Sequence, residues 1–298
     1  MAVKVCLLGE GRWGRAAGEI LSENGHEPFF VHHQETRWPG PFDLLCLAIP
    51  VQHIRETLRR LTAPAVPVVS LGKGLEIRTG FRVTQIVREV WGTGALAALS
   101  GPNFAAEILR GLPAATVVAS ENEDLAAWLQ RLFHNRRFRV YRSSDLAGVE
   151  AGGALKNVYA IAGGLCAGLE LGENALASLL TRCLAEMTRL GVRLGGRPET
   201  FAGLSGLGDL ILTARSRQSR NFLLGLYLAQ GASLKEALAM AGSVVEGMPT
   251  SASVQENPLF ADVKKPVADE VYKILFEGKD IRRSLLDLLE REAAPEGR

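Results

Sequence analysis

VKVCLLGEGRWG, at residues 3–14, decides the fold class of this chain. Its first half is an apolar run typical of a buried strand, and its second half, GEGRWG, opens a helical pattern. In such a turn Gly9 permits a tight bend, Gly11 lets a ligand approach the backbone, and Gly14 lets the helix pack closely on the strand. A bare GxGxxG is a weak signal, but a second strand pattern at residues 28–31 supplies the expected context. The stretch therefore predicts a dinucleotide site whose pyrophosphate lies at the helix N-terminus.

The first half of the chain alternates strand-like and helical segments. The strand-like runs lie at residues 3–8, 28–31, 43–49, 67–71, 96–99, 114–119 and 139–141. The helical patterns between them lie at residues 13–24, 51–61, 82–90, 103–110 and 124–133. This alternation predicts a doubly wound (Rossmann) parallel sheet, with helices crossing over between strands.

The pattern changes near Arg142. From there on, Ala-, Leu- and Gly-rich helical segments follow one another with almost no strand signal, and Ser143-Ser144-Asp145 can cap the first of them. We therefore expect an α/β fold in two parts. A dinucleotide-binding Rossmann domain spans residues 1–143, and an all-α substrate and catalytic domain spans residues 144–298.

Composition narrows the classes of function. The 298 residues are enough for two domains, and 47% of them are hydrophobic. The formal net charge of +2 gives no overall indication of nucleic acid or of an acidic membrane surface. The basic run at residues 131–142 is more typical of a solvated face than of a nucleic-acid patch.

Cysteine usage and apolar runs point to the compartment. The four cysteines have apolar neighbours and no metal-ligand spacing, so we expect small core residues in a reducing compartment and no metal site. No apolar run reaches the roughly 18 residues of a membrane span, and the first strand starts too early to leave room for a signal peptide. We expect a cytoplasmic protein without membrane insertion.

The end of the second strand bears on cofactor choice. A carboxylate is expected there to bind a ribose 2′-hydroxyl, but the position holds His32-His33-Gln34, with Arg37 beyond. Without a carboxylate a 2′-phosphate is not repelled, so NADP(H) is at least tolerated and NAD(H) stays open. Glu35 is an alternative source of the missing carboxylate.

The most informative segment of the second half is GGALKNV at residues 152–158. It places Lys156 in a long apolar helical stretch, where a buried ammonium is costly unless it is paired or takes part in chemistry. Taken alone, a lysine snorkelling from a half-buried helix is the commoner explanation. All five histidines lie before residue 135, so an acid–base group from the helical part must be another residue type, and Lys156 fits best.

Further segments favour an anionic substrate. LGKG (residues 71–74) puts a lysine at the carboxyl end of a strand, where doubly wound sheets bind ligands. SGPNFA (residues 100–105) is a strand-to-helix turn with exposed backbone N–H groups. QSRN (residues 218–221) joins a capping serine, an arginine and an amide at a helix start, which suits a phosphate. In GLGDL (residues 206–210), Asp209 taken alone is more typical of a helix cap.

Together these segments resemble the bacterial type of NAD(P)-dependent glycerol-3-phosphate dehydrogenase, from Val3 to about Leu289. The resemblance rests on ordered blocks: GEGRWG (9–14), KGLE (73–76), SGPNFAAE (100–107), GGALKNV (152–158), GLGDL (206–210), QSRN (218–221) and VVEG (244–247). It implies an oxidoreductase that interconverts glycerol 3-phosphate and dihydroxyacetone phosphate, a small phosphorylated triose, with NADP(H) or NAD(H). The product would supply glycerophospholipid synthesis.

The resemblance also implies roles for single positions. Lys156 matches the catalytic lysine, the proton acceptor when glycerol 3-phosphate is oxidised. Substrate contacts are implied for Lys73, Gly101, Asn103, Lys156, Asp209, Ser219, Arg220 and Asn221. Cofactor contacts are implied for Gly9, Gly11, Arg12, Trp13, Gly14, His33, Lys73, Ala105, Arg220, Val244 and Glu246. A homodimer through the helical domain is plausible.

The sequence departs from the family pattern at several places. Arg12 stands where a small residue is commoner, Gly72 where a threonine often precedes the lysine, and Asn103 where a hydroxyl residue is usual. The segment at residues 34–42 is shorter than in most relatives, which bears on cofactor selectivity more than on chemistry.

Two alternatives stay open at this point. One is another two-domain hydroxy-acid dehydrogenase, of the ketopantoate or hydroxyisobutyrate type, whose carboxylate substrate would not need the cradle at residues 219–221. The other is a dinucleotide-binding sensor without catalysis, against which the presence of Lys156, Lys73 and Arg220 argues.

Overall fold

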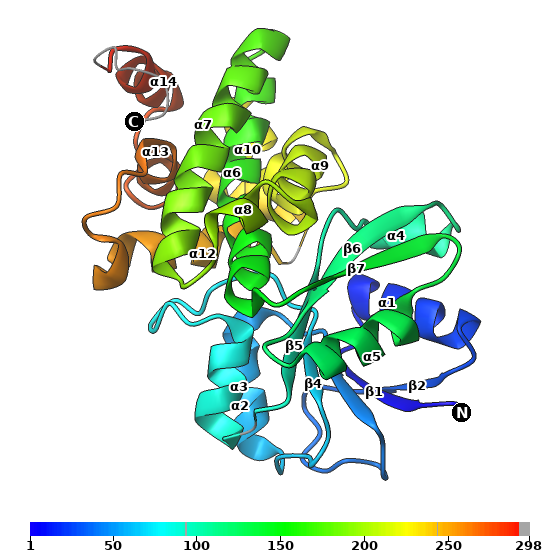
Figure 1. Cartoon of the computed structure of the whole chain (residues 1–298). Helices are drawn as coiled ribbons and strands as arrows, with labels where there is room; N and C mark the ends of the chain where they lie inside the picture. The colour runs from blue at the N-terminus through cyan, green and yellow to red at the C-terminus, as the bar shows by residue number, and fades with distance from the viewer. Residues whose placement is uncertain (93, 243, 292–298) are drawn as a thin grey trace.

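The computed structural model describes residues 1–92, 94–242 and 244–291 and consists of a sheet followed by a bundle of helices (Figure 1). The strands are β1 (Lys4–Leu8), β2 (Glu27–Val31), β3 (Leu44–Leu47), β4 (Val68–Ser70), β5 (Leu96–Ser100), β6 (Ala114–Ala119) and β7 (Phe138–Ser143). They form one sheet in the order β2-β1-β3-β4-β5-β6-β7. The expected Rossmann architecture, followed by a helical region, is confirmed.

One pair of strands differs from the parallel arrangement expected. β5 and β6 pair antiparallel, with Leu99 opposite Val118, whereas every other neighbouring pair is parallel. The connection between them contains only the five-residue helix α4 (Ala105–Leu109). A short connection of this kind lets the chain turn back beside β5 instead of crossing over the sheet.

Helices cover both faces of the sheet. α1 (Arg12–Glu23), α4 and α5 (Glu123–Phe133) lie on one face, and α2 (Val51–Arg60) and α3 (Val83–Trp91) lie on the other. β1 shows why two cores form. Val5 and Leu7 pack on the α1 side while Cys6 and Leu8 pack on the α2 side, because side chains alternate along a strand.

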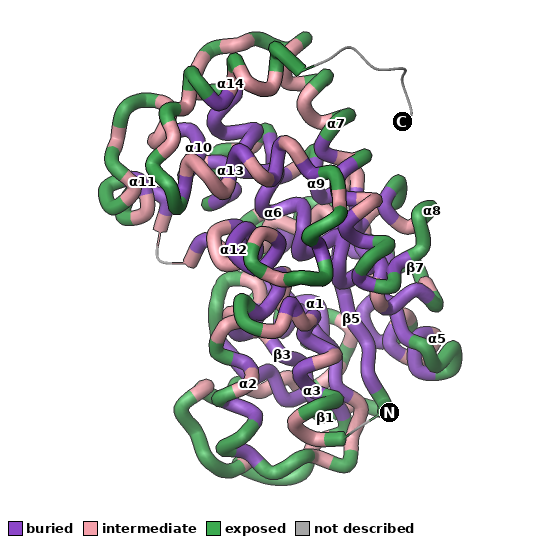
Figure 2. Tube along the Cα trace, turned by 90° about the vertical axis from the view of Figure 1, so that its left-hand side faces the viewer, coloured by how far each residue is buried: buried purple, intermediate pink, exposed green. Residues whose placement is uncertain are grey.

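The second half is built around one central helix, α6 (Leu146–Gly168), which is buried along nearly its whole length (Figure 2). The elements that follow are α7 (Gly172–Arg193), α8 (Pro198–Phe201), the π-helical turn η1 (Leu204–Gly208), α9 (Asp209–Arg215), α10 (Arg220–Ala229), α11 (Leu234–Ala241), α12 (Gly247–Glu256), the 3₁₀ turn η2 (Pro258–Phe260), α13 (Pro266–Phe276) and α14 (Ile281–Leu289). α10 packs most extensively on α6. A helix hydrophobic on all sides belongs inside a bundle.

Sheet and bundle meet where β7 ends and α6 begins. Asp145 is the N-cap of α6, because its Oδ1 accepts from the backbone N–H of Gly148 at 2.9 Å, as the sequence predicted. The two cores interlock there. Leu75 packs in the core of the helical part, while Leu146 and Val149 pack in the core beside β3 and α2.

The structure also bears on the cysteines, on metal binding and on membrane spans. The four cysteines are free and buried, as expected for core residues. Within residues 1–92, 94–242 and 244–291, no cluster of side chains could hold a metal ion. Over the same residues no helix is both long and apolar enough to cross a membrane.

Candidate active site

Lys156 lies near the middle of α6 and is only 5% exposed. It therefore does not snorkel to the surface. The helix can be this deeply buried because glycines face its neighbours: a Cβ at Gly152 would lie 2.8 Å from the carbonyl oxygen of Ser205, and one at Gly153 would lie 2.4 Å from Oγ of Ser100. The paired glycines thus let the π-helical turn and β5 approach the helix that carries Lys156.

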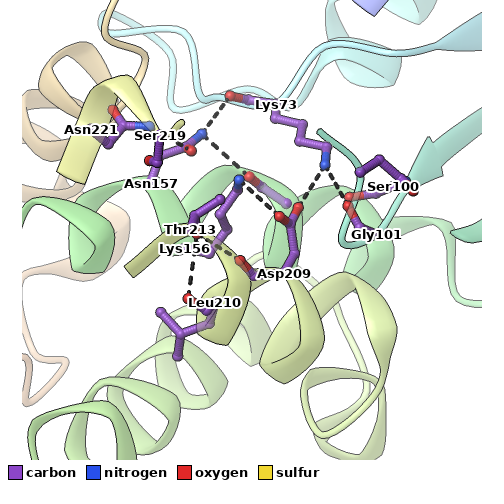
Figure 3. Close-up of polar contacts among 12 residues, drawn as sticks. Lys73, Ser100, Gly101, Lys156, Asn157, Asp209, Leu210, Thr213, Ser219 and Asn221 are labelled. Atoms are coloured by element: carbon purple, nitrogen blue, oxygen red, sulfur yellow. Dashed lines mark hydrogen bonds and ion pairs between the residues drawn. The ribbon is translucent and has the colours of Figure 1, made fainter. Parts of the chain in front are cut away.

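Asp209 joins two lysines from distant parts of the chain (Figure 3). Nζ of Lys156 donates to Oδ1 of Asp209 at 3.0 Å, and Nζ of Lys73 donates to Oδ2 at 2.6 Å. Lys73 also donates to the carbonyl oxygen of Gly101 at 2.8 Å. The carboxylate is buried and so is Lys156, so this is an ion-pair network held largely away from water.

The position of Asp209 excludes the capping role that its sequence context alone favoured. It is the first residue of α9, and α9 has no side-chain cap. Its carboxylate points at the two lysines instead, while Thr213 Oγ1 donates to its backbone carbonyl at 2.6 Å. The charge of Asp209 is thus directed into the site rather than at its own helix.

The pKa of Lys156 is lowered to about 8. Burial is the main cause, because a desolvated ammonium favours its neutral form. The carboxylate of Asp209 opposes this, and the charge of Lys73 adds to it. A lysine with such a pKa can give or take a proton near neutral pH, which an ordinary lysine cannot do efficiently.

A second polar network lies on the same side of α6. Asn157 Nδ2 donates to the carbonyl oxygen of Lys73 at 2.9 Å, and Asn221 Nδ2 donates to Asn157 Oδ1 at 2.8 Å. The backbone N–H of Gly247 then donates to Oδ1 of Asn221 at 2.9 Å. This chain ties α6, α10 and α12 to the loop after β4. Asn157 had no predicted role, although it is the only other strongly polar residue of the apolar stretch beside Lys156.

Ser219 and Asn103 are engaged in local structure. Ser219 is the N-cap of α10, as its position in the sequence suggested, and its Oγ accepts from the N–H of Phe222 at 3.3 Å. Asn103 Nδ2 donates to Oγ1 of Thr116 at 3.0 Å, while its Oδ1 is buried without a hydrogen-bond partner. Oγ of Ser100 is also buried and unpartnered. These unpartnered oxygens lie at the end of β5 and in the turn that follows it.

Arg220 begins α10 and is exposed. The pKa of Arg220 is lowered, mainly because neighbouring protein atoms reduce the hydration of its guanidinium. The charge of Arg12 lowers this pKa further, and the charge of Glu246 raises it. Two arginines from different halves of the chain thus influence each other across the site. Such a pair favours an anion between or beside them.

Glu246 connects the helical part to the sheet. Its Oε1 accepts from the backbone N–H of Val51, at the start of α2, at 3.1 Å, and its Oε2 is buried without a partner. Burial raises the pKa of Glu246 to about 7. A Cβ at Gly74 would lie 2.8 Å from Oε2, so the carboxylate presses against the loop of Lys73. Val244, two residues earlier, is half-buried.

The glycine-rich turn has the geometry that a dinucleotide requires. Gly9 has φ +111°, and a Cβ there would lie 2.7 Å from the carbonyl oxygen of Ala48. A Cβ at Gly14 would lie 2.3 Å from the carbonyl oxygen of Gly9, whereas one at Gly11 would meet nothing within 4 Å. α1 has no side-chain cap, so no capping side chain occupies its N-terminus beside Gly11. The residues present therefore fit a pyrophosphate.

Two further residues that the sequence analysis assigned to the cofactor, Trp13 and Ala105, lie near the glycine-rich turn. Trp13 packs against the core under α1, and its Nε1 is buried without a partner. Ala105 is the first residue of α4 and packs against the same core. Both lie close to the glycine-rich turn in the fold, because α1 and α4 are neighbours.

His33 lies away from the lysines, just beyond the end of β2. Its ring centroid is 4.2 Å from that of His32 and 6.5 Å from that of His53. Burial is the main cause of its lowered pKa, with the charges of His32, His53 and Arg60 adding to it. Several of the predicted residues thus gather around Lys156 and Asp209, and another set lies between Gly9 and His33.

Comparisons of the chain with known proteins agree at the level of families. A family described as NAD-dependent glycerol-3-phosphate dehydrogenase N-terminus matches residues 41–126, and one described as NAD-dependent glycerol-3-phosphate dehydrogenase C-terminus matches residues 145–285. An NAD(P)+ glycerol-3-phosphate dehydrogenase from Moorella thermoacetica is 44% identical over 98% of this chain and 97% of its own length. One from Halorhodospira halophila is 39% identical over 98% of both chains.

Solved structures are similar over the whole length. A glycerol-3-phosphate dehydrogenase from Coxiella burnetii superposes with a TM-score of 0.90 at 31% identity, covering 97% of this chain and 99% of that one. The yeast glycerol-3-phosphate dehydrogenase has a TM-score of 0.78 at 23% identity and shares the fold, covering 98% of this chain and 100% of that one. A ketopantoate reductase from Staphylococcus aureus reaches only 0.52 at 10% identity, over 96% of this chain and 99% of that one.

Proposed function

The chain belongs to the NAD-dependent glycerol-3-phosphate dehydrogenase family, and from this premise we propose how its residues divide the work. It is an oxidoreductase that interconverts sn-glycerol 3-phosphate and dihydroxyacetone phosphate with NAD(H) or NADP(H). The hydroxy-acid dehydrogenase alternative is not favoured, because the likeness to ketopantoate reductase is one of fold alone. The sensor alternative is not favoured either, because the full-length relatives are named as enzymes.

Lys156 is the proposed acid–base residue, and the observation that carries this is its buried pairing with Asp209. The nicotinamide ring of the cofactor, when bound, supplies or accepts the hydride. In the reducing direction Lys156 gives a proton from Nζ to the oxygen that becomes the C2 hydroxyl, and in the oxidising direction it takes that proton back. Asp209 holds Nζ in place and offsets part of the cost of burying its charge.

The substrate phosphate is assigned to the start of α10. Arg220 supplies a fork of donors, Asn221 a side-chain amide, and Ser219 the cap that orders the first turn. Lys73, Gly101 and Asn103 border the same space from the sheet side. Because Lys73 is held by both Asp209 and the carbonyl oxygen of Gly101, it is positioned before substrate arrives.

The cofactor residues are assigned along the glycine-rich turn and its surroundings. Gly9, Gly11 and Gly14 shape the pyrophosphate site. Arg12 and Trp13 flank it, with Ala105, Arg220, Val244, Glu246 and Lys73 on the nicotinamide side and His33 at the adenosine side. The start of α1 supports this assignment, since no side chain caps the helix there.

We also propose the domain bounds of the enzyme, its location in the cell and the use of its product. The dinucleotide-binding part is assigned to residues 1–143 and the catalytic part to residues 144–298. The enzyme is placed in the cytoplasm, supplying glycerol 3-phosphate for glycerophospholipid synthesis.

We propose that the chain forms a homodimer through its helical part, with α7 at the interface. Two apolar grooves flank α7 on the surface. A groove of about 790 Å³ separates α7 from α13 and α14, and one of about 380 Å³ separates it from α9. Leu176 and Leu180 line the smaller groove. A second copy of the chain, packed on α7, would cover both grooves. Sedimentation velocity tests this: a dimer is expected, and Leu180→Glu is expected to give monomers. A monomer at all concentrations in the original chain would contradict the assignment.

Turnover by Lys156→Met tests the proposed chemistry. Methionine fills nearly the same volume without a titratable group, so cofactor binding is expected to persist. Turnover of dihydroxyacetone phosphate is expected to fall about 10²- to 10⁴-fold, the usual contribution of general acid–base catalysis. The matched control is Lys235→Met, a lysine of α11 outside the site, for which turnover should be unchanged. Near-normal turnover by Lys156→Met would remove the lysine from the mechanism.

A further inference from the structure

Three histidines gather where a dinucleotide places its adenosine ribose. His32 and His33 follow β2 directly, and His53 is the third residue of α2. Their ring centroids are 4.2 Å apart for His32 and His33, and 6.5 Å apart for His33 and His53. In a βαβ unit the ribose hydroxyls lie beyond the carboxyl end of the second strand. The cluster therefore borders the position where NADP(H) carries an additional phosphate and NAD(H) does not.

Arg60, a fixed cation beside the cluster, is already bound to protein groups. Arg60 donates from Nη2 to the backbone carbonyl of His33 at 2.9 Å and from Nη1 to Glu56 at 3.0 Å. Nδ1 of His32 lies 3.4 Å from the N–H of Gln34 and accepts from it. The rings of His33 and His53 are left to meet a ligand, at the N-terminal turn of α2, where a negative charge is favoured.

We propose that His33 and His53 together recognise the ribose 2′-phosphate and that a proton is taken up at His33 when it binds, so that preference for NADP(H) over NAD(H) increases as the pH falls. This deepens the proposed cofactor site and rests on it. The ring of His32 packs on that of His33.

The charges around His33 explain why a proton would be taken up on binding. His32 and His53 face it from the strand end and from α2, and Arg60, paired with Glu56, faces it from about two turns further along α2. Together with burial, these groups keep the pKa of His33 below its usual value, so the ring is neutral at pH 7 and above. A phosphate dianion placed between the rings would reverse this, because a nearby negative charge stabilises imidazolium.

The sign of the pH dependence separates this proposal from simpler ones. A phosphate monoester has a second pKa near 6, so if the dianion were bound by fixed charges alone, affinity would rise with pH. If imidazolium must form, affinity falls with pH by up to about tenfold per unit for each proton taken up.

The test uses two fragments, adenosine 2′,5′-bisphosphate and adenosine 5′-monophosphate, titrated calorimetrically into the full chain from pH 6 to 8.5. We expect the dissociation constant of the bisphosphate to rise at least tenfold across this range, and that of the monophosphate to change less than twofold. Titrations in buffers of different ionisation enthalpy should show net proton uptake for the bisphosphate only. A flat or inverted dependence for the bisphosphate would overturn the proposal.

Histidine variants test which side chains are responsible for the proton uptake. His33→Gln with His53→Gln should abolish the pH dependence and weaken the bisphosphate at pH 6.5 at least tenfold more than the monophosphate. His134→Gln is the matched control, since His134 is an exposed histidine at the end of α5, and it should behave like the original chain. A pH dependence that persists in the double variant would overturn the assignment. Turnover with NADH and with NADPH is measured separately, and absence of turnover with both would contradict the proposed function without bearing on the fragment titrations.

Discussion

At the scale of single residues, the chemistry depends on one carboxylate shared by two lysines. Removing the charge of Asp209 would leave Lys156 and Lys73 facing each other in a buried site, where like charges repel strongly. With Asp209 present, Lys156 keeps a pKa of about 8 in spite of its burial. The site therefore keeps a proton available near neutral pH.

The first residue-scale prediction concerns pH. Lys156 is protonated below about pH 8 and neutral above it. Reduction of dihydroxyacetone phosphate needs the ammonium, so kcat/KM should fall above pH 8 by about tenfold per unit. Oxidation of glycerol 3-phosphate needs the neutral amine, so kcat/KM should rise up to pH 8 and then level off. Asp209→Asn should move both transitions to lower pH, because the pKa of Lys156 loses its main upward contribution. Transitions unmoved in that variant would contradict this reading.

The second residue-scale prediction concerns the phosphate. Arg220→Ala should lower kcat/KM for dihydroxyacetone phosphate by about two decades, the usual effect of losing a bidentate, charge-assisted contact. Unphosphorylated dihydroxyacetone, a poorer substrate, should be almost unaffected. The matched control is Arg215→Ala at the end of α9, whose guanidinium pairs with Glu173 on the surface. Equal losses on both substrates would show that Arg220 does not read the phosphate.

Sequence reasoning reached Lys156 because a lone lysine in an apolar helix is physically anomalous. From its local sequence alone Asp209 was expected to be a cap, and its place in the site was implied only by the family resemblance, since nothing local shows that its carboxylate meets Lys73, 136 residues away. The contact between Glu246 and Val51 was out of reach for a different reason. Val51 contributes a backbone N–H, which leaves no mark on residue type.

At the scale of elements, α6 positions the site through close packing. Its glycines replace side chains where the helix meets the turn before Asp209 and where it meets α10. Glycine is unfavourable inside a helix by about 1 kcal/mol relative to alanine, so paired glycines there indicate contacts that a side chain would prevent. The pair at Gly152 and Gly153 was visible in the sequence, but its partners were not.

Gly152→Ala should separate packing from catalysis. Its Cβ would lie 2.8 Å from the carbonyl oxygen of Ser205 and push the turn that carries Asp209. We expect a lower melting temperature and a ten- to hundredfold loss of kcat, because displacements of about 1 Å in a catalytic site have effects of this size. Gly168→Ala is the matched control. Its Cβ would lie 2.8 Å from the carbonyl oxygen of Leu226, so it should lower the melting temperature while kcat is kept. Loss of kcat in both variants, or in neither, would contradict the argument.

Strand and helix positions were largely predictable, because each has its own apolar period. The direction of β6 was not, since alternation along a strand is the same in parallel and antiparallel pairs. The π-helical turn at Leu204–Gly208 was not predicted either. Its sequence is rich in glycine, and its conformation follows from packing on α6 rather than from local preference.

At the scale of the whole molecule, the two halves are less separable than a boundary near residue 143 suggests. Leu75 from the sheet side is buried in the helical core. Glu150 of α6 accepts from Arg82 Nη1 at 2.7 Å and from the N–H of Thr84 at 3.0 Å, at the start of α3. Both charges are buried, so removing one partner would leave an unpaired buried charge.

Unfolding should therefore be a single transition, and the chain carries the probes needed to check this. All four tryptophans lie before residue 129, so their fluorescence reports on the sheet half. Circular dichroism at 222 nm reports mainly on the helices, most of which lie after residue 145. If the halves unfold together, the two signals should give the same denaturant midpoint. Glu150→Ala should lower both midpoints equally, by the equivalent of about 3–5 kcal/mol. Two separate midpoints, or a shift in only one signal, would show instead that the sheet and the helical bundle unfold as independent domains.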